Sequence, residues 1–339
     1  MSTQQETIEK VFFGLAVQAQ QQVPSALIKK KKKVIILAGP TASGKTDLSI
    51  MLAQAIGGEI ISADSMQVYR GMDIGTAKPS REMLDLIPHH LIDIRDITEP
   101  FNVVDFYYEA RQCCLKVLDR GGIPIVVGGS GFYLHSLIYG PPSGPPSVPE
   151  VRIRIEDEME KYGHELLFER LEKIDPQYAR TITKNDKQKI IRALEIIALT
   201  GGKVSDLSWS EQKKIQGFDF RCWFVHRPRE TLYQRIEDRC ERMLESGLLD
   251  EVKKLDAMGI RENHSIMQAI GYRQTMAYLD SPQTDADYKK MVEEFKKASR
   301  HYAKRQFTWF RKEPLFGWID LDLHDPEVIL DIIAQDYER

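Results

Sequence analysis

The sequence has few cysteines and no long hydrophobic run. Its four cysteines, among 339 residues, show no paired C-x-x-C spacing, so neither a zinc site nor a disulfide framework is indicated. No apolar stretch approaches the roughly 20 residues needed to cross a bilayer. The N-terminus also lacks the apolar core of a signal peptide. We therefore expect a protein of the reducing cytoplasm, with no membrane association.

The chain also has little net charge. Its 47 Lys and Arg against 50 Asp and Glu give −3 at pH 7, a balance that by itself gives no indication of a nucleic-acid partner. The basic residues are unevenly distributed, however. A run of lysines extends from Lys29 to Lys33, and residues 296–312 hold seven Lys or Arg and no acidic residue. Such local patches matter more to a polyanion than the total charge.

What is present is a complete phosphate loop, Gly-Pro-Thr-Ala-Ser-Gly-Lys-Thr. It follows the apolar run 34–38 and opens onto a helical pattern at Asp47, the strand–loop–helix context that the motif requires. Its glycines let the backbone form a nest of N–H groups beside a positive helix N-terminus. Lys45 adds a full charge, and the Thr46 hydroxyl is placed to ligate Mg²⁺. The residues expected to bind a di- or triphosphate are Gly39, Pro40, Thr41, Ala42, Ser43, Gly44, Lys45 and Thr46.

Strand and helix patterns alternate after a polar extension, residues 1–33, that we expect to be poorly ordered. This alternation predicts a parallel sheet flanked by helices. The expected strands are 34–38, 59–63, 123–127 and 220–225, and the expected helices of this part are 47–56 and 103–118.

A Pro-rich segment at 140–149 interrupts the alternation, since it suits neither a helix nor a central strand. Helical patterns follow over 150–162, 164–173 and 187–199. The predicted fold class is therefore α/β: residues 34–140 and 216–339 form a P-loop core, and 141–215 form an all-helical insertion.

A carboxylate follows the second predicted strand directly. The carboxyl ends of neighbouring strands meet at the ligand crevice of a doubly wound sheet, so we expect Asp64 near the phosphate loop. There it can ligate Mg²⁺, often through water, or act as a general base. Asp64 and Ser65 are equally good helix N-caps, and position alone does not separate the two interpretations.

Seven sequence motifs occur in an order typical of one enzyme family. They are GPTASGKT, SADSMQVYRGMDIGTAKPS, PHHLID, VGGSGFY, RALE, IGYRQ and KRQFTWFR. From about residue 34 to about 320, the chain resembles the bacterial-type tRNA dimethylallyltransferases, or tRNA isopentenyltransferases. The resemblance implies transfer of a dimethylallyl group from dimethylallyl diphosphate to N6 of adenosine 37, in tRNAs that read codons beginning with U. The phosphate loop then holds the diphosphate leaving group with Mg²⁺, and no phosphoryl group moves.

The resemblance also implies roles for individual residues. Asp64 would orient the N6 amine and take its proton, while Ser65, Met66 and Gln67 line the base pocket. Ser130 would hydrogen-bond the region between diphosphate and allyl group, although the family more often has Thr there. For the leaving-group charge we expect Lys45 and an arginine just after a strand end, either Arg227 or Arg229. The further tRNA contacts that it implies are Arg152, Gln188, Lys189, Ile190, Ile191, Arg192, Gln268, Ala269, Ile270, Gly271, Tyr272, Arg273, Lys304, Arg305, Gln306, Phe307, Thr308, Trp309, Phe310 and Arg311.

Two details of these tRNA segments bear on recognition. Lys189 stands where the family usually has Arg, and a lysine cannot reproduce a bidentate contact. On a helix, Phe295, Tyr302 and Trp309 form one apolar stripe, which predicts core packing rather than base stacking. The opposite face presents Arg300, Lys304 and Arg311, which suit phosphate contacts or simple solvation.

Three other functions are compatible with a phosphate loop. A relative that prenylates free AMP, ADP or ATP would share the loop and Asp64, but it needs neither tRNA-contacting segments nor a helical insertion. A small P-loop kinase needs an arginine-bearing lid and a phosphoryl-acceptor site, and nothing in the sequence marks either. The third function, an RNA-binding GTPase or scaffold, is disfavoured because the sequence has no N-K-x-D-like motif for guanine recognition. The expected cofactor is Mg²⁺, the expected partners are the tRNA anticodon stem-loop and dimethylallyl diphosphate, and a monomer is expected.

Overall fold

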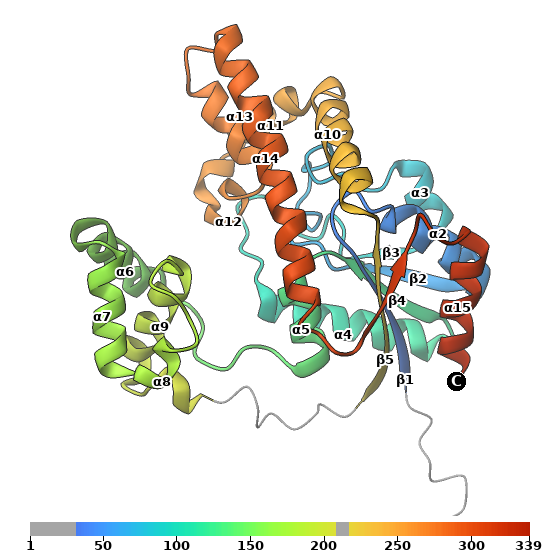
Figure 1. Cartoon of the computed structure of the whole chain (residues 1–339), viewed down its shortest axis with the longest axis horizontal. Coiled ribbons are helices and arrows are strands. Elements are labelled where there is room, and N and C mark those ends of the chain that lie inside the picture. Colours follow the sequence, from blue (N-terminus) through green and yellow to red (C-terminus); the bar gives the residue numbers. More distant parts are fainter. Residues whose placement is uncertain (1–31, 208–216) are drawn as a thin grey trace, which may run out of the picture.

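A six-stranded parallel sheet forms the centre of the protein in the computed structural model, which describes residues 32–207 and 217–339. The strands lie in the order β3-β2-β4-β1-β5-β6 (Figure 1). The predicted α/β fold is confirmed. The strands are β1 (Lys32–Ala38), β2 (Gly58–Ser62), β3 (His89–His90), β4 (Ile123–Gly128), β5 (Phe218–His226) and β6 (Phe316–Asp320).

Helices cover both faces of the sheet, because successive side chains of a strand point to opposite faces (Figure 1). In β1, Val34 and Ile36 belong to one buried cluster, whereas Ile35 and Leu37 belong to the other. One face packs against α2 (Lys45–Ile56), α3 (Arg81–Leu86) and α15 (Pro326–Glu338). The other packs against α4 (Val103–Asp119), α5 (Gly131–Tyr139), α10 (Arg229–Glu245) and α14 (Asp285–Phe310). Beyond these, α11 (Leu248–Ala257), α12 (His264–Met267) and α13 (Tyr272–Leu279) pack against α10, α14 and one another.

The first strand begins earlier than the sequence pattern predicts. Lys32 and Lys33 pair with β5 as part of β1, although we expected them to end the polar extension. The ammonium of Lys33 donates hydrogen bonds to the carbonyl oxygens of Tyr337 (2.5 Å) and Glu338 (2.9 Å) at the end of α15. The lysine run is therefore partly structural, and residues 1–31 of the extension lie outside the described residues.

A second group of helices lies apart from the sheet (Figure 1). It contains α6 (Pro149–Tyr162), α7 (His164–Ile174), α8 (Pro176–Ala179) and α9 (Lys187–Thr200), followed by a 3₁₀ turn over Val204–Asp206. These helices bury a cluster of their own around Ile155, Leu171 and Ile190. Residues 140–148 reach it without helix or strand. The exact division of the chain into domains stays a prediction.

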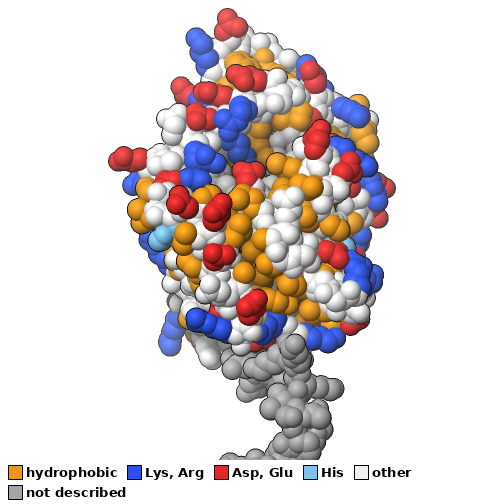
Figure 2. All heavy atoms as spheres, turned by 90° about the vertical axis from the view of Figure 1, so that its right-hand side faces the viewer, with side chains coloured by type: hydrophobic (Ala, Val, Ile, Leu, Met, Phe, Trp, Pro, Cys, Tyr) orange, Lys and Arg blue, Asp and Glu red, His pale blue; other side chains and the backbone are white. Residues whose placement is uncertain are grey.

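The described surface mixes charges of both signs. Figure 2 shows Lys and Arg side chains interspersed with Asp and Glu and with hydrophobic groups over one face, which fits the small net charge of −3. Among the described residues, no helix combines the length and apolar character needed to span a bilayer.

Candidate functional site

The phosphate loop joins the carboxyl end of β1 to the first turn of α2. Ala42 and Gly44 adopt left-handed φ values of 63° and 102°, which turn successive N–H groups toward one side as an anion-binding nest. A Cβ atom on Gly39 would lie 2.4 Å from the carbonyl oxygen of Val225 on β5, so only glycine fits where the loop leaves the sheet. The loop therefore presents a nest of N–H groups that can receive a phosphate group.

Gln306 of α14 ties the phosphate loop to the loop that follows β4. Its Oε1 accepts a hydrogen bond from the amide of Thr41 (2.9 Å), and its Nε2 donates to the carbonyl oxygen of Gly129 (2.9 Å). Ser130 comes next and is the N-cap residue of α5, so it stands beside the phosphate loop. Gln306 is buried, and its expected role as a tRNA contact is wrong because both ends of its amide hold these loops together.

Lys45 bends back over the phosphate loop, where its ammonium donates to the carbonyl oxygen of Pro40 (2.9 Å). Burial lowers the pKa of Lys45 to about 8; the nearby Arg239 also lowers it, and Asp64 opposes the shift. A bound anion would stabilise the protonated form of Lys45 and raise its pKa again.

The affinity of the phosphate loop for inorganic diphosphate is expected to fall above pH 8. The protonated form of Lys45 attracts the anion, and the free protein loses this proton near pH 8. Above that pH, binding must take up a proton, so the affinity decreases by up to about tenfold per pH unit. Calorimetric titration between about pH 7 and 9.5 measures this. The ionisation of diphosphate itself affects both proteins alike, so the fall due to Lys45 is the difference between wild type and Lys45→Met, and identical profiles for the two would contradict the assignment.

Three arginines surround the outer side of the phosphate loop. The Nε of Arg227 donates to the carbonyl oxygen of Ser43 (2.9 Å), and its guanidinium pairs with Asp322. From α10, Arg235 donates to the carbonyl oxygen of Ala42 (2.9 Å). Arg239, one turn further on, donates to the hydroxyl of Thr41 (3.0 Å). The structure thus supplies a cluster of positive charge where a diphosphate would leave.

Of the two arginines expected from the sequence, only Arg227 reaches the phosphate loop. Arg229 lies over the ring of Tyr233, 5.0 Å from its centroid, and makes no hydrogen bond or ion pair within the described residues. Sequence reasoning missed Arg235 and Arg239. Their four-residue spacing on a helix that follows a strand end was the available signal, because it places both on one helical face.

A cavity of about 350 Å³ adjoins the loop and contains Asp64. Segments far apart in the sequence line it, including the residues after β2, the middle of α10, the 268–272 segment and α14. Its lining residues from the predicted site are Thr41, Asp64, Ser65, Met66, Gln268, Ala269, Ile270, Tyr272 and Arg305, and Arg239, Tyr302 and Thr76 also contribute.

Asp64 stabilises a turn with one oxygen and leaves the other free. Its Oδ1 accepts from the amides of Met66 (2.8 Å) and Gln67 (3.4 Å), an arrangement typical of Asx turns. No helix begins here, because the chain runs as loop until α3. Within the described part of the chain, Oδ2 has no hydrogen-bond partner. The expected helix N-cap is therefore wrong: Oδ1 holds a loop turn, while Oδ2 is free to act as a base.

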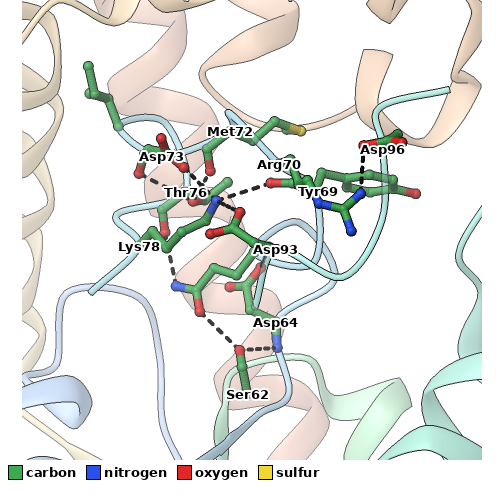
Figure 3. A network of polar contacts seen from close by, with 12 residues as sticks. Ser62, Asp64, Tyr69, Arg70, Met72, Asp73, Thr76, Lys78, Asp93 and Asp96 are labelled. Carbon is green, nitrogen blue, oxygen red and sulfur yellow. Dashed lines mark hydrogen bonds and ion pairs between the residues drawn. The ribbon is translucent and has the colours of Figure 1, made fainter. Parts of the chain in front are cut away.

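The loop after Asp64 is braced by a network of polar contacts (Figure 3). Gln67 accepts from the hydroxyl of Ser62 (2.9 Å), and its Nε2 donates to the carbonyl oxygen of Thr76 (3.4 Å). The Lys78 side chain is only 4% exposed and pairs with Asp73 and Asp93, each at 2.5 Å. Gln67 thus holds the loop and does not line the base pocket as expected.

Glu251 of α11 fixes the far wall of the cavity, and sequence reasoning missed it. Its carboxylate accepts from the consecutive amides of Asp73 (2.9 Å), Ile74 (2.7 Å) and Gly75 (3.1 Å) and from the Tyr272 hydroxyl (2.6 Å). Burial, and then the charge of Glu251, raise the pKa of Tyr272, so this hydroxyl stays a donor. Gly75 and Tyr272 line the cavity, whose shape therefore depends on this single carboxylate.

The phosphate loop fits Mg²⁺ only as an ion whose other ligands are phosphate oxygens and water. The part of the chain that the structure describes has no group of three or more His, Cys, Asp or Glu able to hold a metal. The Thr46 side chain is exposed at the start of α2 and offers one oxygen. Mg²⁺ keeps several waters and usually takes one or two protein ligands plus phosphate oxygens, which this donor set suits.

Comparison with known proteins identifies the family. A family model described as IPP transferase matches residues 67–313. The chain is 62% identical over 337 residues to a tRNA dimethylallyltransferase of Protochlamydia amoebophila, covering 99% of this chain and 98% of that protein. This chain belongs to the IPP transferase family. The resemblance expected from its seven motifs is confirmed, and so is its assignment as an enzyme.

Two solved structures resemble this IPP transferase family member. The full-length tRNA isopentenylpyrophosphate transferase from Bacillus halodurans has a TM-score of 0.66 and 41% identity, covering 91% of this chain and 97% of that one. A eukaryotic dimethylallyltransferase acting on tRNA has a TM-score of 0.70 and 32% identity, covering 85% of this chain and 73% of that one. Both share the P-loop core described above.

In the helical group α6–α9, several residues expected to contact tRNA have partners within the protein. Ile190 and Ile191 are 0% and 4% exposed, so their expected contact with tRNA is wrong because both side chains form the helical core. Arg192 pairs with the buried Glu195 and also donates to the carbonyl oxygen of Pro145. Arg192 thereby anchors the connecting segment. Of the other expected contacts here, Arg152 bonds Gln188 (2.5 Å) and pairs with Glu156, whereas Lys189 is largely exposed.

The expected aromatic stripe of α14 divides into three environments. Phe295 is buried in the core as expected, where it also forms part of the cavity wall, and Tyr302 lines the cavity beside Asp64. Trp309 is 39% exposed, so its expected core packing is wrong, and it packs against Gly131 instead. Phe310 is 1% exposed and cannot contact tRNA. On the basic side, Arg300 pairs with Glu237 (2.6 Å), which removes it from the phosphate-contact surface.

The remaining expected contacts stay predictions. Gly271, with a φ of 92°, is buried and packs near Phe295, so it shapes the segment that carries Gln268 and Ile270 to the cavity. Arg273 and Arg305 are exposed, and within the described residues neither pairs with an acidic side chain. Such unpaired arginines beside the cavity suit an RNA backbone.

Proposed function

We propose that this protein transfers the dimethylallyl group of dimethylallyl diphosphate to N6 of adenosine 37, in tRNAs that read codons beginning with U. The observation that best supports this is a single cavity lined by Asp64, by Thr41 of the phosphate loop and by Arg239. A diphosphate leaving group and a proton-bearing nucleophile can meet there. By its family the chain is a tRNA prenyltransferase; the donor, the position in the tRNA and a monomeric, cytoplasmic enzyme are our proposals.

The leaving group requires the larger electrostatic contribution. When the allylic carbon–oxygen bond breaks, the carbon delocalises its positive charge, while negative charge collects on the departing diphosphate. Lys45, Arg239 and the loop amides place positive charge there before reaction, which is the most effective form of electrostatic catalysis. Bound through Thr46 and phosphate oxygens, Mg²⁺ would supply further positive charge to the diphosphate.

The acceptor needs a base because the N6 lone pair of adenine is delocalised into the ring. The free Oδ2 of Asp64 can accept a hydrogen bond from N6–H, orient the amine, and take the proton as the N–C bond forms. Ser130 stands beside the phosphate loop through the Gln306 bridge, where its hydroxyl can contact the bridging region of the donor. The adenosine must leave its stack in the anticodon loop, which costs a few kcal/mol.

One assay tests this function directly. The purified protein is incubated with labelled dimethylallyl diphosphate, Mg²⁺ and undermodified tRNA whose anticodon ends in A, with AMP offered in a parallel reaction. We expect label in the RNA, at a single adenosine, and none in AMP. Modification of AMP without tRNA would instead support an adenylate isopentenyltransferase, and label in neither would contradict both.

A further inference from the structure

A second hollow, of about 700 Å³, lies beside the phosphate loop and apart from the Asp64 cavity. It is bounded by the end of β5, the first turns of α10, one side of α14, and β6. The KRQFTWFR segment divides between the two spaces: Arg305 lines the Asp64 cavity, whereas Lys304, Phe307 and Arg311 line the second hollow. The proposed prenyl transfer does not use this hollow.

The floor of the hollow is aromatic. The ring centroids of His226 and Trp318 are 5.5 Å apart, and the ring centroid of Phe307 lies 6.1 Å from each of them. Leu232 lies behind these rings and is only 1% exposed, whereas Trp318 is 37% exposed. An apolar group of a few carbons would therefore find a preformed surface here.

The rim of the hollow is cationic. Arg229, Lys304 and Arg311 line it and are all exposed. None of the three forms an ion pair with a carboxylate in the described part of the chain, unlike Arg227 beside them, which pairs with Asp322. Three uncompensated cations over an aromatic floor suit a ligand with a strongly negative end and an apolar end.

The position of the hollow decides which ligand this is. Arg227 lines the hollow and also bonds the phosphate loop at Ser43 (2.9 Å), so the hollow adjoins the diphosphate site. In the sheet order, Asp64 follows β2 on one side of β1, whereas the hollow lies at β5 and β6 on the other. The nucleobase belongs on the Asp64 side, which favours a small diphosphate ester over RNA in the hollow.

We propose that this hollow is a second binding site for the isoprenoid diphosphate, which it occupies on its way to the phosphate loop. Arg229, Lys304 and Arg311 attract the diphosphate, and the aromatic floor receives the apolar tail. Passage past Arg227 then delivers the diphosphate to the loop. This proposal rests on the proposed function for the identity of the ligand, but the anion site itself can be tested separately.

A binding experiment tests the site without turnover. The Lys45→Ala substitution weakens anion binding at the phosphate loop. In this variant, calorimetry with inorganic diphosphate should still detect a weak site. Dimethylallyl diphosphate should bind there about tenfold more tightly, because its tail covers the aromatic floor. Adding Arg229→Gln and Arg311→Gln should abolish this residual binding. If residual binding is absent, or survives these substitutions, the proposal is overturned, whatever the enzyme prenylates.

A kinetic experiment tests the use of the site. In otherwise wild-type protein, R229Q/R311Q should lower kcat/KM for the donor about tenfold at low salt, with kcat unchanged and a weaker salt dependence. This proposal reassigns Lys304 and Arg311, which the family resemblance gives as tRNA contacts, to the donor, so the KM for tRNA should stay the same. The control, K289Q/K290Q, removes two exposed lysines from the same helix α14 and should change neither value. A higher KM for tRNA would make the hollow an RNA phosphate site instead, and unchanged donor kinetics would also overturn the proposal.

Discussion

Asp64→Asn is expected to lower kcat by about 10²–10⁴-fold while the protein folds and binds tRNA normally. Asparagine keeps an Oδ1 that can accept from the amides of Met66 and Gln67, the two bonds that Asp64 makes in the structure. It cannot take a proton from N6 of adenosine. The substitution therefore removes the base while it preserves the turn. Single-turnover kinetics with saturating tRNA and donor measure the effect on chemistry.

Asp64→Ala separates the second role of the same carboxylate. Alanine removes both the base and the turn, so D64A should be less stable than D64N by about 0.5–2 kcal/mol in urea denaturation. Ser65→Ala is the matched control, because Ser65 lines the same cavity without being a proton acceptor of comparable strength. Turnover of D64N within tenfold of wild type would rule Asp64 out as the base. Loss of tRNA binding in D64N would assign it a binding role.

Arg239→Gln is expected to raise the KM for the donor by about 10–100-fold and to lower kcat, because a charge-assisted contact to the diphosphate is lost. Burial lowers the pKa of Arg239, with Asp64 opposing the shift, and its described contact is the neutral Thr41 hydroxyl. Partly buried without a carboxylate partner, the cation destabilises the ligand-free protein. R239Q should therefore be as stable as wild type or more stable.

The combination of lost activity and retained stability is what distinguishes a ligand-binding arginine from a structural one. Arg242→Gln provides the control, since Arg242 lies on the same helix α10 and is exposed. It should leave both properties unchanged. A large loss of stability in R239Q would mean that Arg239 holds the phosphate loop through Thr41 and is a structural residue, not an anion-binding one. Steady-state kinetics and thermal unfolding together decide between the two.

The phosphate loop and the strand pattern could be read from sequence because each depends on short-range rules. A phosphate loop needs Gly39, Gly44 and Lys45 at fixed spacing, and apolar runs predict buried strands. The same rules placed Asp64 at the carboxyl edge of β2. The family motifs then located the segments around Gln268 and Arg305, both of which line the Asp64 cavity.

The motifs did not tell which residues of a segment face the ligand. In the RALE and KRQFTWFR segments, Arg192 anchors the connecting segment to α9, and Gln306 joins two loops. Glu251 and Arg239 belong to no recognised motif, yet one shapes the cavity and the other reaches the phosphate loop. The loop residues that they bond, Ile74 and Thr41, lie 177 and 198 residues away in the chain, a relation that no local pattern contains.

By itself, the sequence determined the α/β class, the phosphate loop, the base candidate Asp64 and the family. Each of these rests on periodicity or on residues close together in the chain. Only the tertiary structure decided that α10 supplies the arginines, that Gln306 and Glu251 hold the loops, and that a second cationic hollow adjoins Arg227. These features depend on where distant helices cross the edge of the sheet, and that position is set by the packing of the whole core.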